Sequence, residues 1–146
     1  MMQIARILCA AAAVLCAGSA GLCAVPAQNV EKAPLGFVVV TYFHGNFRCA
    51  NCRNIEKYTK EAVEKYFSKE LGSGKVVFRV INVETKGNEH FTDDYQLYTK
   101  SVIVSLMKGG KEAKFNNLTR IWEYLADMDA FQGYVKSEIE RYLKEL

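Results

Sequence analysis

Residues 35–67 read LGFVVVTYFHGNFRCANCRNIEKYTKEAVEKYF and join an apolar segment to an amphipathic one. Most of residues 35–43 are β-branched or aromatic, which is typical of a buried central strand. From about residue 49 to residue 71, apolar side chains recur at spacings of three and four, which predicts a helix with one apolar face. Cys49 and Cys52 lie where this helix begins. The sequence therefore predicts a strand, a short loop and a helix that starts with a Cys-X-X-Cys pair.

The remaining chain continues the alternation of strands and helices. Gly109 and Gly110 predict a tight hairpin, because paired glycines accept the positive φ angles of such turns. The order β-α-β-α-β-β-α predicts a three-layer α/β/α domain around a four-stranded mixed sheet, with the first two strands parallel. The predicted elements are strands over 76–83, 101–107 and 112–115, a helix over 89–99, a helical piece over 120–126, and a last helix N-capped by Asp129.

The first 27 residues have the pattern of an export signal. Arg6 is their single charge, and an uninterrupted apolar run follows over residues 7–17. Val25-Pro26-Ala27 favours cleavage before Gln28, because signal processing selects small residues at such positions. The run is shorter than the approximately 20 residues of a membrane-spanning helix. We therefore expect a chain exported to the periplasm or another extracytoplasmic compartment, with no membrane span after cleavage.

This interpretation divides the chain into a signal peptide over 1–27, a linker over 28–34 and one domain over 35–146. Two alternatives stay open for the N-terminal segment. One is an uncleaved signal anchor that uses residues 7–25, and the other is a lipoprotein with Cys23 as the lipidated residue.

The charge of the predicted mature chain is nearly balanced. Arg6 is one of 19 basic residues, so 18 basic and 16 acidic residues remain after residue 27, a net charge of +2. A balance of this kind does not favour nucleic acid or an anionic membrane as a partner.

The distribution of the cysteines favours chemistry over a structural role. Three of the five, Cys9, Cys16 and Cys23, lie in the predicted signal, so the domain keeps only Cys49 and Cys52. Two cysteines in an exported protein are expected to pair. The ring that they close is very small and removes little entropy from the unfolded chain, so a purely structural disulfide is a poor explanation.

The beginning of a helix favours a reactive thiolate. Its backbone N–H groups are unpaired and carry a partial positive charge, which stabilises the thiolate that takes part in disulfide exchange. We expect Cys49 to be the exposed nucleophile with a lowered pKa and Cys52 to resolve the mixed disulfide.

Four further residues can tune this thiolate. Arg48 and Arg53 flank the pair and add positive charge. His44 lies five residues before Cys49 and can reach the same site, and Glu56, one turn after Cys52, is a candidate proton relay.

Other functions of two cysteines stay open. Structural zinc is disfavoured, because it needs four ligands and the domain offers only His44 and His90 in addition. Transfer of copper(I) or arsenite through two thiols remains an alternative, as does an inert local disulfide. We predict no cofactor and no resident metal.

The chain resembles the thioredoxin superfamily in residues 43–67, in the pair Cys49 and Cys52, and in the turn over 107–111. The resemblance covers most of residues 35–146. It implies a thioredoxin fold, redox-active cysteines that contribute to cell redox homeostasis, and a docking loop opposite the disulfide at Ser101 and Val102.

A narrower resemblance concerns residues 42–63, YFHGNFRCANCRNIEKYTKEAV. This segment is similar to exported thioredoxin-like proteins identified as the ArsF-type subunit of an aromatic nitroreductase. That resemblance implies a dedicated protein redox partner, with a membrane-bound component, that handles nitroaromatic or arsenical compounds.

Four positions depart from the thioredoxin pattern. Lys100-Ser101-Val102 lacks the cis proline of thioredoxins, which weakens the case for a general protein reductase and strengthens the metal alternative. The buried carboxylate and lysine of the family are replaced by Phe43 and Val80, and the tryptophan before the first cysteine by Arg48.

We expect a reduction potential above that of a cytosolic thioredoxin, because positive charge at the helix start stabilises the reduced form. A third hypothesis, a non-catalytic thioredoxin-fold subunit, also stays open.

Overall fold

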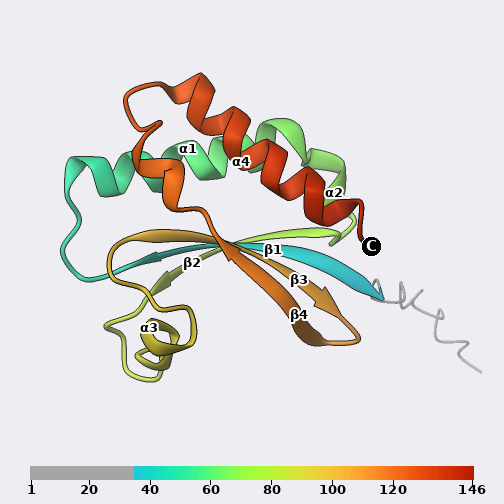
Figure 1. Ribbon diagram of the computed structural model, residues 1–146, viewed down its shortest axis with the longest axis horizontal. Coiled ribbons are helices and arrows are strands. Elements are labelled where there is room, and N and C mark those ends of the chain that lie inside the picture. Colours follow the sequence, from blue (N-terminus) through green and yellow to red (C-terminus); the bar gives the residue numbers. More distant parts are fainter. Residues whose placement is uncertain (1–34) are drawn as a thin grey trace, which may run out of the picture. The chain divides into compact units, whose positions relative to one another are not determined.

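The protein is described by a computed structural model, which covers residues 35–146 (Figure 1). The predicted signal peptide, the linker and the lipidation alternative at Cys23 lie outside the described residues.

Four strands form one mixed sheet in the order β2-β1-β3-β4. Strand β1 pairs parallel with β2 and antiparallel with β3, and β3 pairs antiparallel with β4. The parallel pairing of the first two strands was predicted from the sequence. Strands β1 and β3 run antiparallel, because residues 83–100 return the chain to the edge of the sheet at which β1 ends. The strands are β1 (Gly36–His44), β2 (Val76–Asn82), β3 (Ser101–Lys108) and β4 (Lys111–Asn117).

Helices cover both faces of the sheet (Figure 1). Helices α1 and α4 pack together on one face, and the short α3 lies on the other. The helices are α1 (Ala50–Tyr66), α2 (Ser68–Gly72), α3 (His90–Asp94) and α4 (Met128–Leu143), with a 3-10 turn, η1 (Thr119–Trp122). The predicted three-layer, thioredoxin-like α/β/α fold is confirmed.

Two helix predictions need correction. The helix expected over 49–71 is interrupted at Phe67, whose φ of −129° leaves the helical region while its side chain stays buried. The helix expected over 89–99 ends after five residues. Gln96 there has a positive φ of 50°, and a residue in this conformation ends a helix.

The N-cap of the last helix is Asp127 and not Asp129. The Asp127 carboxylate accepts a hydrogen bond from the backbone N–H of Ala130 at 3.0 Å. Asp129 lies inside the first turn, where a carboxylate interacts favourably with the helix dipole. Both aspartates suit a helix N-terminus, so the local sequence does not distinguish them.

The main core lies between the sheet and the pair α1 and α4. Side chains of β1 and β3 such as Val40 and Val104 meet Ile55 of α1 and Phe131 of α4, and all four are fully buried. A second, smaller cluster lies beneath α3 and contains Phe43, Leu97 and Ile103. Alternate residues of β1 therefore serve opposite faces of the sheet.

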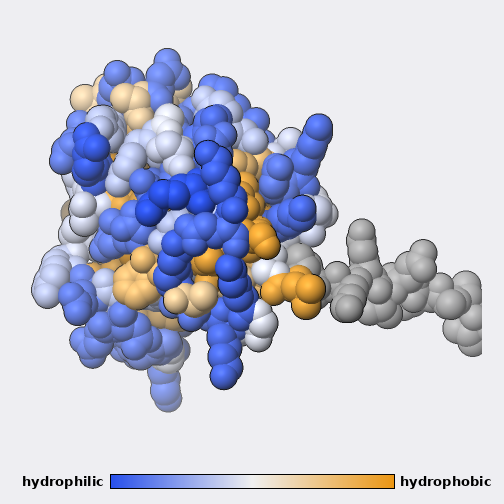
Figure 2. Space-filling view, turned by 45° about the vertical axis from the view of Figure 1, so that its right-hand side comes forward, coloured by the Kyte–Doolittle hydropathy of each residue, from blue (hydrophilic) through white to orange (hydrophobic). Residues whose placement is uncertain are grey.

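The exterior is mixed, as its composition predicts. The face shown in Figure 2 is largely hydrophilic and is interrupted by separate hydrophobic patches. Within residues 35–146, no helix combines the length and the apolar character that a membrane crossing requires.

The sheet brings two distant loops together. Phe43 near the end of β1 is the register partner of Ser101, the first residue of β3. Because these strands run in opposite directions, the segment after β1 and the segment before β3 lie at the same edge. The Cys-X-X-Cys pair follows β1 at this edge.

Candidate redox site

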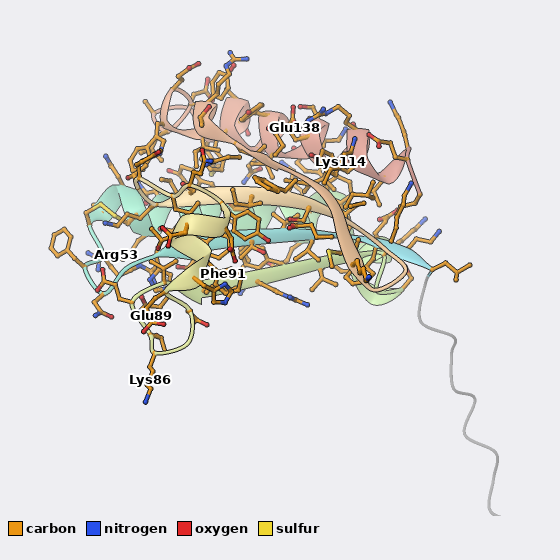
Figure 3. The ribbon with its side chains drawn as sticks, turned by 60° about the horizontal axis from the view of Figure 1, so that its bottom comes forward. Arg53, Lys86, Glu89, Phe91, Lys114 and Glu138 are labelled. Carbon is orange, nitrogen blue, oxygen red and sulfur yellow. A yellow bond between two sulfur atoms is a disulfide. The ribbon has the colours of Figure 1, made fainter. Side chains whose placement is uncertain are left out.

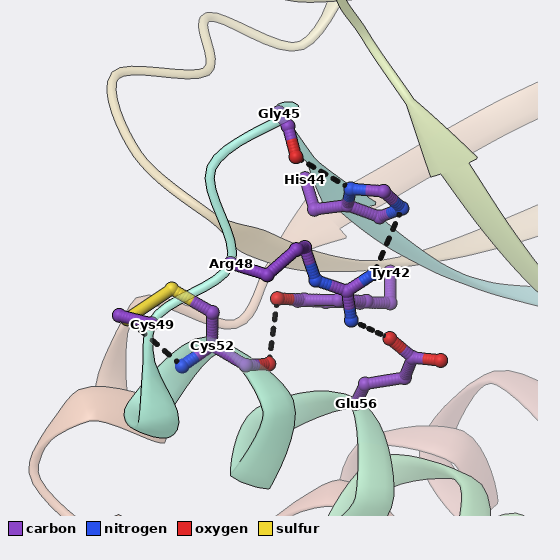
Figure 4. Close-up of a disulfide and its surroundings, with 7 residues drawn as sticks. All are labelled: Tyr42, His44, Gly45, Arg48, Cys49, Cys52 and Glu56. Carbon is purple, nitrogen blue, oxygen red and sulfur yellow. Dashed lines mark hydrogen bonds and ion pairs between the residues drawn. A yellow bond between two sulfur atoms is a disulfide. The ribbon is translucent and has the colours of Figure 1, made fainter.

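Cys49 and Cys52 form a disulfide, with their Cα atoms 5.0 Å apart (Figure 4). Cys49 is partly exposed, whereas Cys52 is only 1% exposed. Cys49 is therefore the accessible member of the pair and Cys52 the buried one.

Cys49 is the N-cap residue of α1. Its backbone is extended, and its sulfur accepts a hydrogen bond from the N–H of Cys52 at 3.1 Å. A sulfur atom thus takes the place of the side-chain oxygen that usually caps a helix. The first turn of α1 contains no acidic residue. A thiolate on Cys49 would therefore meet an N–H donor and the positive end of the helix dipole, and both stabilise negative charge.

Tyr42 connects β1 to the second cysteine. Its hydroxyl is buried and donates a hydrogen bond to the backbone carbonyl of Cys52 at 2.8 Å. Burial raises the pKa of Tyr42 to about 12, so the hydroxyl keeps its proton at neutral pH. Tyr42 was not among the site residues predicted from the sequence. The only available signal was its place in β1, one position before the buried Phe43.

Arg48 reaches the predicted site but points away from the sulfur atoms (Figure 4). Its guanidinium binds the carboxylate of Glu56, and its other terminal nitrogen lies 3.3 Å from Nε2 of His44. The guanidinium also lies over the ring of Tyr42, 5.7 Å from the centroid. Within residues 35–146, Nε of Arg48 is buried without a hydrogen-bond partner. The positive charge of Arg48 is therefore largely balanced by Glu56.

The contacts of His44 define its tautomer. Nδ1 lies 2.8 Å from the carbonyl oxygen of Gly45, and a carbonyl can only accept. Nδ1 therefore carries the proton, and Nε2 is left to accept a hydrogen bond from Arg48. His44 thus contributes to the site by holding Arg48, in a chain of contacts that ends at Glu56.

Glu56 was a candidate proton relay for Cys52. In the structure, one of its carboxylate oxygens binds Arg48, and the Glu56 side chain is 30% exposed. This pairing turns the carboxylate toward Arg48 and away from the sulfur atoms (Figure 4).

The docking-loop residues Ser101 and Val102 belong to β3 itself. They are 5% and 0% exposed and pair with Phe43 and Tyr42 of β1. The exposed residues of this region are Tyr98 and Thr99, which precede the strand. The predicted loop therefore lies beside the segment that leads to the cysteines, but the accessible side chains come earlier in the chain.

The remaining candidates lie apart from one another. Figure 3 shows Arg53 at the disulfide end of α1, where its side chain is exposed. His90 is on α3 and pairs with Asp94 at 2.7 Å. In the part of the chain that the structure describes, no three His, Cys, Asp or Glu side chains are grouped as a metal site.

Phe43 is buried in the smaller core cluster. Its ring packs against Phe91 and Tyr95, each 5.3 Å away between centroids, on the face that α3 covers. The position therefore contributes to packing and offers no proton acceptor to Cys52.

The chain was compared with protein families, curated proteins and solved structures. No protein-family model matches the chain, and no curated protein matches its sequence. Its structure is similar to Fasciola hepatica thioredoxin, with 20% identity, a TM-score of 0.44, and coverage of 73% of this chain and 81% of that one. For the reduced Schistosoma mansoni thioredoxin pre-protein the identity is 17%, the TM-score 0.46, and the coverage 75% and 82%. For oxidised Plasmodium falciparum thioredoxin, the identity is 16% and the TM-score 0.43, and the match covers 73% of this chain and 81% of that one.

Structural similarity at such low identity concerns only the general arrangement of the chain. The strand order and pairing of this chain define that arrangement independently of the comparisons. The chain has a thioredoxin-like α/β fold with a Cys-X-X-Cys disulfide at the beginning of α1.

Proposed function

We propose that this protein is an extracytoplasmic thiol–disulfide oxidoreductase, or a dithiol electron carrier, that serves a dedicated protein partner. The observation that carries the proposal is the position of Cys49 at the N-cap of α1. Its sulfur accepts the N–H of Cys52 at 3.1 Å and is partly exposed, while Cys52 is buried. This arrangement favours a thiolate that a partner can reach, with a second thiol held beside it.

The exchange reaction follows from these positions. In the reduced protein, the Cys49 thiolate attacks one sulfur of a partner disulfide, and the other partner sulfur leaves as a thiolate. Cys52 then loses its proton and attacks the Cys49 sulfur. The mixed disulfide breaks, the second partner sulfur leaves with its electron pair, and the Cys49–Cys52 disulfide forms. The partner gains two electrons and the protein loses two, and the reverse sequence oxidises a partner dithiol.

The proposed location rests on the first 27 residues, which have the pattern of an export signal. It agrees with the distribution of cysteines, because residues 28–146 contain only Cys49 and Cys52. The partner that we propose is a protein, with a membrane-bound component. The resemblance of residues 42–63 to the ArsF-type nitroreductase subunit connects it with nitroaromatic or arsenical compounds.

Trapping of the mixed disulfide tests the proposal. In the organism that encodes the protein, the Cys52→Ser variant should accumulate covalent complexes through Cys49, because the resolving thiol is absent. Non-reducing electrophoresis and mass spectrometry identify these complexes. The control is the Cys49→Ser, Cys52→Ser double variant, which should trap none. Absence of any complex specific to Cys52→Ser would contradict a redox partner.

Transfer of a soft metal is the second candidate. The stretch that opens β3 has no proline, and two adjacent sulfur atoms suit copper(I) or arsenite. Titration of the reduced protein with arsenite, compared with a small dithiol, separates the candidates. An affinity no higher than that of the small dithiol removes this second candidate and leaves the redox proposal in place.

A further inference from the structure

An open hollow lies along the first three turns of α1, and neither cysteine lines it. Its volume is about 500 Å³. Four basic residues and one acidic residue line it, so four positive charges against one negative charge leave a net charge of +3. The lining residues are Arg48, Arg53, Glu56, Lys57 and Lys60.

Three of the positive charges face outward. Glu56 binds Arg48, so the charges of these two residues compensate each other. Arg53 takes part in no ion pair within residues 35–146, although other arginines of this part do. Lys57 and Lys60 lie 3.9 and 3.7 Å from carboxylates one turn further along α1, in pairs whose members are all 40% exposed or more. Exposed pairs of this kind contribute little to stability, so an acidic ligand can replace them at little cost.

Arg53, Lys57 and Lys60 lie in one line along α1. Positions 53, 57 and 60 are separated by four and three residues, so their side chains emerge on the same face of a helix. At 1.5 Å per residue, Arg53 lies roughly 6 Å along α1 from Cys49, and Lys60 lies roughly 16 Å from it. We call Arg53, Lys57 and Lys60 the cationic stripe. It begins at the reactive pair, where the helix dipole adds further positive potential.

We propose that the cationic stripe binds an acidic segment of the redox partner and so selects partners whose exchanging cysteine lies near Asp or Glu residues. This inference rests on the proposed function and identifies the chemistry of the partner. An extended chain covers about 3.3 Å per residue, so the stripe reaches acidic residues up to about five positions from the attacked cysteine. A line of only three cations on a chain whose residues 28–146 have a net charge of +2 suits an acidic peptide better than nucleic acid.

The test compares the rates at which the reduced protein attacks two peptides. The protein is the full-length chain with Cys9, Cys16 and Cys23 replaced by serine, so that Cys49 and Cys52 are its only thiols. Each peptide has one cysteine, activated as a mixed disulfide with an aryl thiol, and is flanked on both sides by three Glu or by three Gln residues. The Cys49 thiolate attacks the peptide sulfur and the coloured aryl thiolate leaves. Cys52 then releases the reduced peptide and the Cys49–Cys52 disulfide forms.

We expect the Glu peptide to react at least about tenfold faster than the Gln peptide at low ionic strength, and less than about twofold faster in 0.5 M salt, because screening removes steering by surface charges. Both rates are divided by those of dithiothreitol with the same peptide, which corrects for the intrinsic reactivity of each mixed disulfide. The Lys57→Glu, Lys60→Glu variant should lose the preference, and the milder Lys57→Gln, Lys60→Gln variant should lose part of it.

The matched control is Lys69→Glu, Lys144→Glu, which changes the net charge equally on α2 and at the end of α4, outside the stripe. It should keep the preference for the Glu peptide. Equal corrected rates for the two peptides, or an equal loss of the preference in the control variant, would contradict the binding of acidic segments by the cationic stripe. Inhibition by a single-stranded DNA oligomer at lower concentrations than a cysteine-free Glu peptide would contradict it as well. Each of these results would leave the redox proposal intact. No release of aryl thiolate that depends on Cys49 would instead contradict the proposed function itself.

Discussion

The guanidinium of Arg48 binds the carboxylate of Glu56, and both groups point away from the disulfide sulfur atoms (Figure 4). Arg48 precedes Cys49 in the sequence, and proximity alone predicts that its charge stabilises the Cys49 thiolate. The ion pair reduces that contribution, because Glu56 supplies an opposite charge at direct contact. The N–H of Cys52 and the helix dipole therefore carry more of the stabilisation than Arg48.

The Arg48–Glu56 pair predicts the effect of removing the carboxylate. In the Glu56→Gln variant, Arg48 keeps its charge without a counter-charge, so the reduced, thiolate-containing form becomes more stable and the reduction potential rises. An exposed ion pair is worth about 0.2–1 kcal/mol, which corresponds to about 5–20 mV for a two-electron couple. Equilibration with glutathione buffers measures the potential.

The control for this change is Glu61→Gln. It removes the same charge from α1, but Glu61 pairs with Lys57 and lies more than two turns after Cys52. Its potential should stay within about 5 mV of the unmodified protein, since exposed charges further away are screened by salt. Equal shifts in both variants would indicate a general charge effect instead of the Arg48 pair.

The different exposure of the two cysteines predicts different reactivities. Cys49 in the Cys52→Ser variant should react with iodoacetamide at pH 7 at least about tenfold faster than Cys52 in the Cys49→Ser variant, because only Cys49 combines access with a stabilised thiolate. Rates are followed by mass spectrometry in proteins that lack the cysteines of residues 1–27. A Cys49 rate no higher than that of a free cysteine peptide would contradict both the proposed thiolate and the proposed function.

Tyr42 predicts a loss of stability at alkaline pH. Its pKa rises from 10.0 to about 12 in the folded protein because the hydroxyl is buried. The folded state therefore holds the proton more tightly than the unfolded state. This contribution is complete below pH 10 and is lost as the pH rises from 10 to 12, by at most about 2–3 kcal/mol. Burial raises the pKa of Tyr95 to about 12 as well, so the two residues act in the same pH range.

The Tyr42→Phe variant isolates the contribution of Tyr42. It should be about 1–2 kcal/mol less stable at pH 7, because the buried Cys52 carbonyl loses its hydroxyl donor. Its stability should then fall less between pH 10 and 11.5 than that of the unmodified protein. Urea unfolding of the oxidised protein measures both effects, with Tyr98→Phe as a control that removes an exposed hydroxyl. The same alkaline fall in Tyr42→Phe would contradict the assignment.

The N-cap of α4 predicts a contrast between two aspartates. Asp127→Ala should cost about 1 kcal/mol of unfolding free energy, because the Ala130 N–H loses its acceptor. Asp129→Ala should cost less than about half of that, since it removes only a favourable dipole interaction. Thermal or urea unfolding of the two variants measures the difference. A larger loss for Asp129→Ala would favour the boundary that the sequence alone indicated.

Much of the fold follows from local patterns. The continuous apolar run of β1, the spacing of Ile55, Ala62 and Val63 on α1, and the glycine pair of the hairpin each predict their element, because these signals depend on neighbouring residues. The length of α3 did not follow from the sequence. Phe91 and Tyr95 have the spacing of one helical face, but Gln96 takes a positive φ where the chain turns toward β3.

The chain order alone determined that two cysteines follow a strand and open a helix, because that relationship spans only a few consecutive residues. Tertiary structure decided what surrounds them. It joined Tyr42 to the carbonyl of Cys52, paired Arg48 with Glu56, and placed Ser101 and Val102 inside β3. These contacts depend on how β1 packs against α1 and β3, and residues distant along the chain meet only once that packing exists.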